Sequence, residues 1–157
     1  MTKEEKNGVL EQIVAYSPTI IFAVMLISVV IHINLPLAIG FNTTVIRIIG
    51  FVVMLLSPLI IIWAQNVRRS LYQAVTDRTC FNFFSGPYRF SRHPIYLGLI
   101  LVLLGFALLL NSVVTLVLTV LTIIFFSFVI IPIEERELDE HCPGVYAEYK
   151  TRVRMWL

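Results

Sequence analysis

The chain has 157 residues, of which 58% are hydrophobic and 14% charged, with a formal net charge of +2. A soluble domain usually carries about 25% charged residues and lacks long apolar runs. This composition excludes an ordinary soluble enzyme and indicates one small integral membrane domain over residues 1–157. No nucleic-acid partner is expected.

Four apolar segments are candidates for crossing a bilayer, which takes about 20 mostly apolar residues in a helix. Ser17 and Pro18 suit the start of the first, and Pro58 predicts a kink in the second. The predicted fold is therefore all-α, with about four transmembrane helices. Their ranges are 17–35, 45–65, 94–110 and 113–133.

Only Asn111 and Ser112 separate the last two segments. One unbroken helix over residues 94–133 would be about 60 Å long, roughly twice the thickness of the hydrocarbon core. The chain must therefore turn, and Asn-Ser is compatible with a turn. We expect a C-terminal helical hairpin, in which Gly98 and Gly105 share one face that allows a close helix approach.

Basic residues gather on one side of this four-helix arrangement, with Arg47 as the exception. The positive-inside rule makes that side cytoplasmic, so we predict a multi-pass protein with both termini in the cytoplasm. In a prokaryote the membrane would be the plasma (inner) membrane. The mixed-charge start of the chain shows no cleavable signal pattern, so the first helix is expected to stay as an anchor.

The sequence predicts two functional parts within the single domain. Residues 1–65 form a two-helix N-terminal part, and residues 66–157 form a cofactor-binding part with the polar connection, the hairpin and a cytoplasmic tail. In the connection, residues 81–84 (FNFF) suit an interfacial anchor. In the tail, Tyr146, Tyr149 and Val153 fall on one helical face, and Trp156 and Leu157 suit a return to the interface.

The stretch SGPYRFSRHPIYLG, residues 85–98, gathers polar groups at a membrane boundary. Pro94 suits the first turn of a helix, which places His93 at or next to the N-cap, where free N–H groups favour anions. Arg89 and Arg92 can grip a carboxylate or phosphate. Tyr88 and Tyr96 can stack on a ring or donate a hydrogen bond. The alternative is that these residues only anchor the helix at the interface.

A second cluster, Glu134 and Glu135, follows the fourth segment. The hairpin returns this segment to the end at which the third begins, so we expect the two glutamates beside Arg92 and His93. They suit an amine or ribose hydroxyls, or form a simple Arg–Glu clamp at the surface. No metal site is expected, since His141 and Cys142 offer too few ligands of the kind that zinc needs.

These motifs resemble the isoprenylcysteine carboxyl methyltransferase family and its phospholipid methyltransferase relatives. The resemblance covers residues 86–153, from GPYRFSRHPIYLG through the hairpin to EERELDEHCPGVYAEYKTRV. The family's residues carry over onto three groups. They are Arg92, His93, Pro94 and Tyr96, with Tyr88 beside them, then Glu134, Glu135 and Leu138, and finally Tyr146, Tyr149 and Arg152.

The resemblance implies a methyltransferase of the EC 2.1.1 type. It would bind S-adenosylmethionine in a pocket formed by the hairpin and capped by the tail, at the cytoplasmic face. The acceptor would be lipophilic, an isoprenylcysteine carboxylate-like group or another lipid reached from the membrane. Arg92 and His93 suit the cofactor's carboxylate, and Glu134 or Glu135 its amine and ribose. Arg92, His93 and Glu135 are the catalytic candidates, with His93 or a glutamate as the base for an amine acceptor.

Two alternatives remain open from the sequence. Sterol-type and related lipid reductases have a similar C-terminal helical arrangement but use NADPH. A non-enzymatic four-helix membrane protein would use the same clusters as interface anchors. Affinity for S-adenosylmethionine, for a nicotinamide cofactor or for neither distinguishes the three.

Overall fold

The computed structural model describes residues 3–40, 43–74, 83–142 and 144–156. These residues form helices, with a single isolated bridge between Ala38 and Ser112 as the one β-type contact among them. The all-α prediction is confirmed. In chain order the elements are α1 (Lys3–Asn34), α2 (Thr43–Ala74), the 3₁₀ turn η2 (Gly86–Arg89), α3 (Pro94–Leu110), α4 (Val113–Phe125), the π-helical turn η3 (Phe126–Ile130), α5 (Ile131–His141) and α6 (Val145–Arg152).

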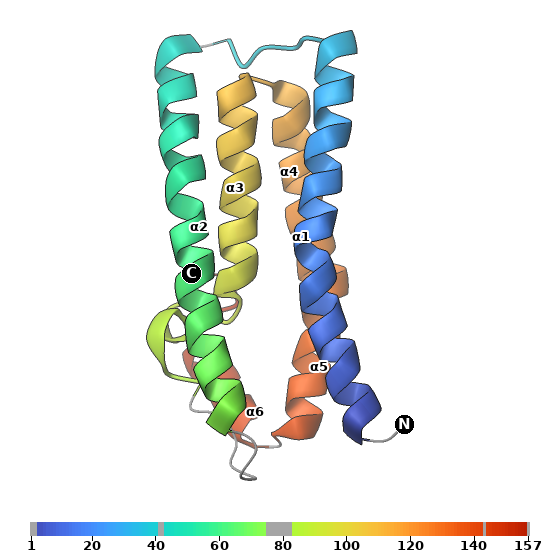
Figure 1. Cartoon of the computed structure of the whole chain (residues 1–157), viewed down its shortest axis with the longest axis vertical. Coiled ribbons are helices and arrows are strands. Elements are labelled where there is room, and N and C mark those ends of the chain that lie inside the picture. The colour runs from blue at the N-terminus through green and yellow to red at the C-terminus, as the bar shows by residue number, and fades with distance from the viewer. Residues whose placement is uncertain (1–2, 41–42, 75–82, 143, 157) are drawn as a thin grey trace.

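The long helices lie side by side along one axis, with α3 and α4 between α1 and α2 (Figure 1). Helix α3 packs against α1, α2 and α4, and nine of its 17 residues are buried. A helix that is apolar on every side is expected at the centre of a bundle or in lipid. The core is accordingly built around α3, with Ile21 of α1, Ala64 of α2 and Phe126 of η3 packed against it.

Three helical segments are long and apolar enough to cross a membrane: Tyr16–Asn34, Thr43–Arg69 and Val113–Glu140. The fourth predicted span, α3, has 17 residues. At 1.5 Å per residue it is about 25 Å long, at the short end of the range for a spanning helix.

The predicted start of the first helix is wrong. Helix α1 begins at Lys3, and Pro18 lies inside it. Helix α2 likewise runs through Pro58. Its polar end extends the helix beyond the apolar segment, as far as Ala74. Prolines are tolerated inside such helices where neighbouring helices and hydroxyl side chains satisfy the freed backbone groups.

The predicted turn of the hairpin is confirmed at Asn111. This residue has a left-handed φ of 52°, a conformation that asparagine tolerates better than most side chains. The Ser112 N–H then donates to the carbonyl of Ala107 at 3.0 Å. The Ser112 side chain caps α4 by accepting from the Thr115 N–H at 3.3 Å.

Gly98 and Gly105 of α3 both face α2, in agreement with the prediction that they share one face of the helix. A Cβ atom at Gly105 would lie 2.7 Å from the backbone nitrogen of Met54 and 2.9 Å from the carbonyl oxygen of Gly50. A Cβ atom at Gly98 would lie 2.5 Å from Cγ1 of Ile61. At Gly105 the two helices therefore meet backbone to backbone, as small residues allow in membrane bundles.

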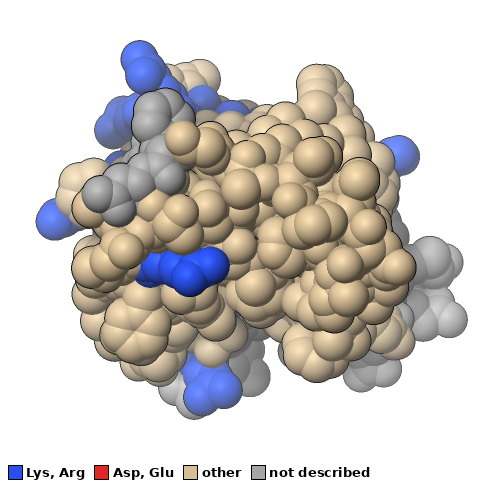
Figure 2. Space-filling model, turned by 90° about the horizontal axis from the view of Figure 1, so that it is seen from above, with Lys and Arg blue, Asp and Glu red and all other residues tan. Residues whose placement is uncertain are grey.

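Charge is distributed unequally between the two ends of the bundle. Figure 2 looks onto the end that carries the connection from α1 to α2, and this face is mostly uncharged, with one basic patch on it and further basic side chains at its rim. The α1 N-terminus lies at the opposite end (Figure 1). The tail joins that same end, since the Arg92 N–H donates to the carbonyl of Arg154 at 3.0 Å. The cytoplasmic orientation of that end remains a prediction from the positive-inside rule.

We predict that Gly105→Ala destabilises the protein more than Gly98→Ala. The methyl group at residue 105 meets backbone atoms that cannot move aside, whereas at residue 98 it meets the side chain of Ile61. Overpacking of this kind costs about 1–3 kcal/mol. Thermal unfolding of the two variants in the same detergent measures the difference. Equal losses would contradict a backbone contact at Gly105.

Candidate active site

The segment before α3 is fixed by local backbone geometry. His93 is the N-cap of α3, and Pro94 occupies its first turn, as the sequence predicted. Upstream, Ser91 is buried, and its hydroxyl oxygen accepts from the His93 N–H at 3.3 Å. The same hydroxyl donates to the carbonyl of Met155 at 3.1 Å. The N-terminal end of α3 with its N-cap His93, called the head of α3 below, is thus attached to the C-terminal tail.

The two predicted charged clusters meet at the head of α3. The Arg92 guanidinium donates to Oε1 of Glu135 at 2.7 Å. The His93 ring lies between both carboxylates, with Nε2 at 3.2 Å from Glu135 Oε1 and Nδ1 at 3.4 Å from Glu134 Oε2. The His93 side chain is only 3% exposed. Residues more than 40 positions apart therefore form one buried ionic cluster.

The π-helical turn η3 determines which residues of the last long helix face inward. Buried positions on α4 follow α-helical spacing at Thr115, Thr119, Thr122 and Phe126. The next is Ile131, five residues further on, followed by Glu134. A π turn adds one residue to the helical turn. Uninterrupted α-helical spacing would have turned residues 130 and 133 inward instead, which carry no charge.

The electrostatics of the cluster favour a protonated histidine. Burial lowers the pKa of His93, but hydrogen bonds and charges from Glu134 and Glu135 outweigh it, and the net pKa is raised above the usual value. A neighbouring carboxylate stabilises the charged imidazole in this way. In its protonated form the His93 ring pairs with both glutamates.

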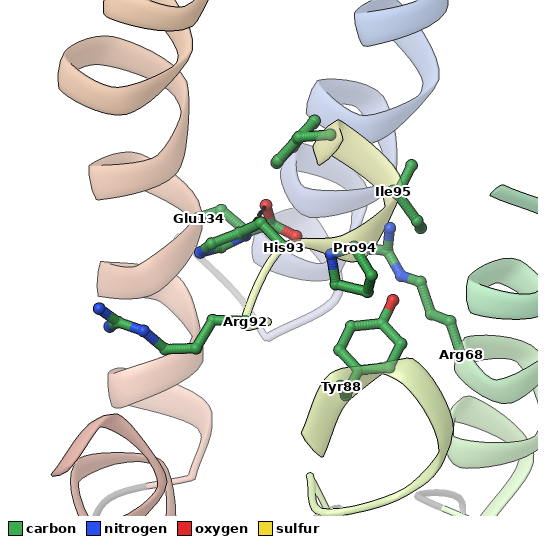
Figure 3. A pocket seen from close by; sticks show the side chains of 8 residues that line it. Arg68, Tyr88, Arg92, His93, Pro94, Ile95 and Glu134 are labelled. Carbon is green, nitrogen blue, oxygen red and sulfur yellow. Dashed lines mark ion pairs between the residues drawn. The ribbon is translucent and has the colours of Figure 1, made fainter. Parts of the chain in front are cut away.

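A pocket of about 220 Å³, including its open mouth, lies beside this cluster (Figure 3). Two buried polar atoms in its walls make no hydrogen bond within the described structure, the Tyr96 hydroxyl and Nε of Arg92, whereas Oε2 of Glu134 has the His93 ring at 3.4 Å. Such atoms are costly unless a ligand or water satisfies them. The lining residues are Arg68, Tyr88, Arg92, His93, Pro94, Ile95, Tyr96 and Glu134.

An aromatic cluster supports the pocket from the side of the tail. The ring of Phe83 lies 5.2 Å from that of Tyr146 and 5.1 Å from that of Tyr149. The Tyr149 hydroxyl donates to the carbonyl of Tyr88 at 2.5 Å. For Phe83 the predicted interfacial anchor is wrong, because its ring is buried among the tyrosines of α6. Phe84 is 41% exposed, and residues 81–82 lie outside the described residues.

The model of the phospholipid methyltransferase family matches residues 19–143, most of the chain. The chain belongs to the phospholipid methyltransferase family. No curated protein and no solved structure gives a significant match. The family resemblance expected from the motifs is confirmed, and the match extends it upstream to the second half of α1 and all of α2.

Most of the predicted site residues of this methyltransferase come together. Tyr88, Arg92, His93, Pro94, Tyr96 and Glu134 line the pocket, and Glu135 contacts Arg92 and His93 directly. Leu138, Tyr146 and Tyr149 belong to the aromatic cluster, which reaches the pocket through Tyr88. Trp156 packs against the main core, and Leu157 lies outside the described residues.

Arg152 does not reach the pocket. Its side chain is 63% exposed and forms an ion pair with Glu148 at 2.6 Å, one helical turn earlier in α6. The inward face of α6 continues from Tyr146 and Tyr149 to Val153, and Arg152 lies at the edge of this face, where its side chain reaches Glu148 instead. In this conformation the methyltransferase therefore holds Arg152 on the surface of the tail helix.

Arg68 and Ile95 also line the pocket, although neither is predicted as a site residue from the sequence. Arg68 belongs to the polar end of α2, which packs against η2 and brings the guanidinium to the pocket. The sequence does contain one indication that Arg68 could reach the site: it lies at the end of an apolar span, on the same predicted side of the membrane as most other basic residues. Ile95 is an ordinary apolar residue that follows the His-Pro pair, and nothing in the pattern distinguishes it.

We predict that the methyltransferase loses stability as the pH rises above about 6.5. A histidine whose pKa is raised in the folded state stabilises fully below its unfolded pKa, and this contribution disappears as the pH rises through the folded value. His93→Gln is expected to flatten this part of the pH dependence of thermal unfolding in detergent. His32→Gln, on α1, is the control and should leave it unchanged. A wild-type profile that is flat above pH 6.5 would contradict the protonated cluster.

Proposed function

We propose that this methyltransferase uses S-adenosylmethionine to methylate a lipophilic acceptor at the cytoplasmic face of the membrane. The observation that carries the proposal is the buried cluster of Arg92, His93, Glu134 and Glu135 beside a pocket at the head of α3. Family membership supports methyl transfer to a lipid-type substrate. Beyond family membership, we propose three points: the use of S-adenosylmethionine, the cytoplasmic face as the site of reaction, and a lipophilic acceptor.

The polar groups of the pocket suit the amino-acid end of S-adenosylmethionine. The Glu134 carboxylate, which also pairs with the His93 ring at 3.4 Å, is a site for its ammonium group or ribose hydroxyls. Nε of Arg92 and the head of α3 are sites for its carboxylate. The cavity behind the pocket mouth measures only about 20 Å³, room for about one water molecule, whereas sites for drug-sized ligands span about 300–1,000 Å³. In this conformation only a terminal polar group of the cofactor would fit inside, with the rest at and beyond the pocket mouth.

The residues of the tail have a supporting role in this proposal. Tyr146 and Tyr149 are almost completely buried, and their rings pack on each other and on Phe83. The hydroxyl of Tyr149 holds the backbone of Tyr88, whose side chain lines the pocket. Tyr146 and Tyr149 thus position Tyr88 rather than flank the cofactor themselves.

When bound, S-adenosylmethionine supplies a methyl group on a sulfonium centre for direct displacement by the acceptor. The protein mainly has to align the partners and exclude water. A carboxylate or thiolate acceptor needs no base, whereas an amine acceptor must lose a proton. The raised pKa of His93 favours its protonated form, which makes it the weaker candidate for a base. Glu134 lines the pocket, and its carboxylate, paired with the His93 ring at 3.4 Å, is the candidate that remains.

The acceptor is proposed to enter from the surrounding lipid. The pocket lies at the polar ends of α2 and α3, next to outer helix faces that carry exposed apolar side chains such as Leu59, Ile62 and Trp63. An isoprenylcysteine carboxylate-like group or another lipid fits this position. The family match favours methyl transfer over the NADPH-dependent reductase and over a non-enzymatic helix bundle.

We predict that Arg92→Ala and Glu135→Ala each weaken binding of S-adenosylmethionine at least tenfold. Each change leaves a partly buried charge without its partner at 2.7 Å, which disorders the head of α3. Isothermal titration calorimetry of the purified protein in detergent measures the affinity.

Arg136→Ala is the matched control for these two variants, because Arg136 neighbours Glu135 but its side chain is 81% exposed. Circular dichroism and thermal unfolding must show that all three variants are folded. Unchanged affinity in both Arg92→Ala and Glu135→Ala would reject the assignment of the site.

We predict that Glu134→Gln lowers the turnover rate with little effect on cofactor affinity if the acceptor is an amine. The substitution keeps the shape of the side chain and removes the base, and proton transfer by a positioned base contributes about 10²–10⁴-fold to rate. The measurement follows label from methyl-labelled S-adenosylmethionine into lipid extracted from native membranes, beside calorimetric binding. Full turnover in Glu134→Gln would exclude a base at this position.

A further inference from the structure

The first turn of α5, directly after the π turn η3, contains a proline on the outside of the bundle. Pro132 belongs to this first turn and is exposed, whereas the preceding Ile131 is completely buried. The Pro132 ring therefore contributes little to the packing of the core. Since the five residues of the π turn carry no signal of their own, Pro132 is the neighbouring residue whose chemistry can account for it.

A proline at residue 132 conflicts with an uninterrupted α-helix. It has no N–H to donate, and its ring would press against the carbonyl group four residues earlier, that of Phe128. The π turn widens the backbone here, because the Ile131 N–H donates to the carbonyl of Phe126, five residues earlier. Local π adjustments are one way in which membrane helices accommodate a proline. The π turn thus relieves the conflict that Pro132 creates.

The prolines inside the other two long helices are accommodated differently. Helices α1 and α2 stay α-helical through Pro18 and Pro58. Each of these prolines follows a buried serine, and the Ser57 hydroxyl donates to the carbonyl of Val53 at 2.5 Å. Hydroxyl side chains are another way to accommodate a proline in a membrane helix. Pro132 follows an isoleucine, which has no hydroxyl group, and the widened turn takes this role.

The register of α5 decides whether the charged cluster forms. The π turn adds one residue to the helix, and with it the carboxylates of Glu134 and Glu135 reach the His93 ring at 3.4 and 3.2 Å. One residue corresponds to a rotation of about 100° around a helix with 3.6 residues per turn. Without the π turn, both carboxylates would be rotated away from the ring by about this angle.

We infer that Pro132 is a positioning residue of the methyltransferase, which holds the π turn and thereby the register of Glu134 and Glu135. It acts through these glutamates and does not touch the pocket itself. The consequence for the cofactor rests on the proposed function, because the two glutamates belong to the proposed cofactor site. The register of α5 does not depend on that function.

Pro132→Ala tests this role, because alanine donates an N–H and favours the α-helix. We expect the α-helical register to become populated and calorimetric affinity for S-adenosylhomocysteine to fall about tenfold, since only the π register is competent to bind. Thermal unfolding in detergent should still show a folded protein. Pro58→Ala is the matched control, since Pro58 is also exposed inside a helix but has no π turn beside it. It should bind like the wild type.

Deletion of Phe128 separates a change of register from general damage to the helix. Phe128 belongs to the π turn and is 77% exposed. Its removal from Pro132→Ala takes out the residue that the π turn adds, so that an uninterrupted α-helix directs Glu134 and Glu135 toward His93 again. We expect this combined variant to regain most of the wild-type affinity, whereas deletion of Phe128 with Pro132 in place should lose affinity. General damage cannot produce two losses that cancel when they are combined.

Wild-type affinity in Pro132→Ala would overturn the inference, because tertiary packing would then hold the π turn without the proline. A loss that deletion of Phe128 does not restore would overturn it as well. If Pro132→Ala does not fold, Pro132→Leu gives the same comparison, since leucine is also a good helix former.

A wild-type protein that does not bind S-adenosylhomocysteine would reject the proposed function and leave the register to a second measurement. That measurement is the pH dependence of thermal unfolding above about pH 6.5, which reports the pairing of His93 with the glutamates. Pro132→Ala should flatten it, and recovery is expected when Phe128 is also deleted. An unchanged profile in Pro132→Ala would overturn the inference whatever the cofactor is.

Discussion

The ring of His93, buried between Glu134 and Glu135, is the interaction on which the rest of the site depends. A buried charge is costly unless it is paired, and removing one partner of such a pair costs about 3–5 kcal/mol. The ring nitrogens lie 3.2 and 3.4 Å from the two carboxylates, and Arg92 holds Glu135 from outside. The cluster therefore joins the head of α3 to α5 and closes one wall of the pocket.

Two backbone features bring these side chains together. The left-handed Asn111 reverses the chain, so that the helix after it returns to the level at which α3 began. The π turn at Phe126–Ile130 then shifts the inward face by one residue, from residues 130 and 133 to Ile131 and Glu134. Without the first feature the glutamates would lie beyond the opposite side of the membrane. Without the second they would face away from His93.

The sequence predicted the features that follow from length and chemistry. The hairpin had to exist because residues 94–133 are too long for one span, and the hairpin alone predicts that Glu134 and Glu135 approach His93. The π turn was not predictable in this way, since its residues FSFVI carry no signal that separates them from an α-helix. Arg68 and Arg152 show the limit of motif reasoning. The orientation of the helix that carries each residue decides whether it reaches the pocket, and that orientation depends on tertiary packing.

The tail belongs to the site although the family match ends at residue 143. Its backbone accepts hydrogen bonds from Arg92 and Ser91 through the carbonyls of Arg154 and Met155, and Tyr149 holds the backbone of Tyr88. These contacts fix both ends of the segment from Tyr88 to Arg92 without adding a charge to the pocket. Backbone carbonyls can be supplied by many sequences, although the contact from Tyr149 to Tyr88 needs a hydroxyl group. The charged cluster has no such freedom, since its geometry requires particular side chains at particular turns of α3 and α5.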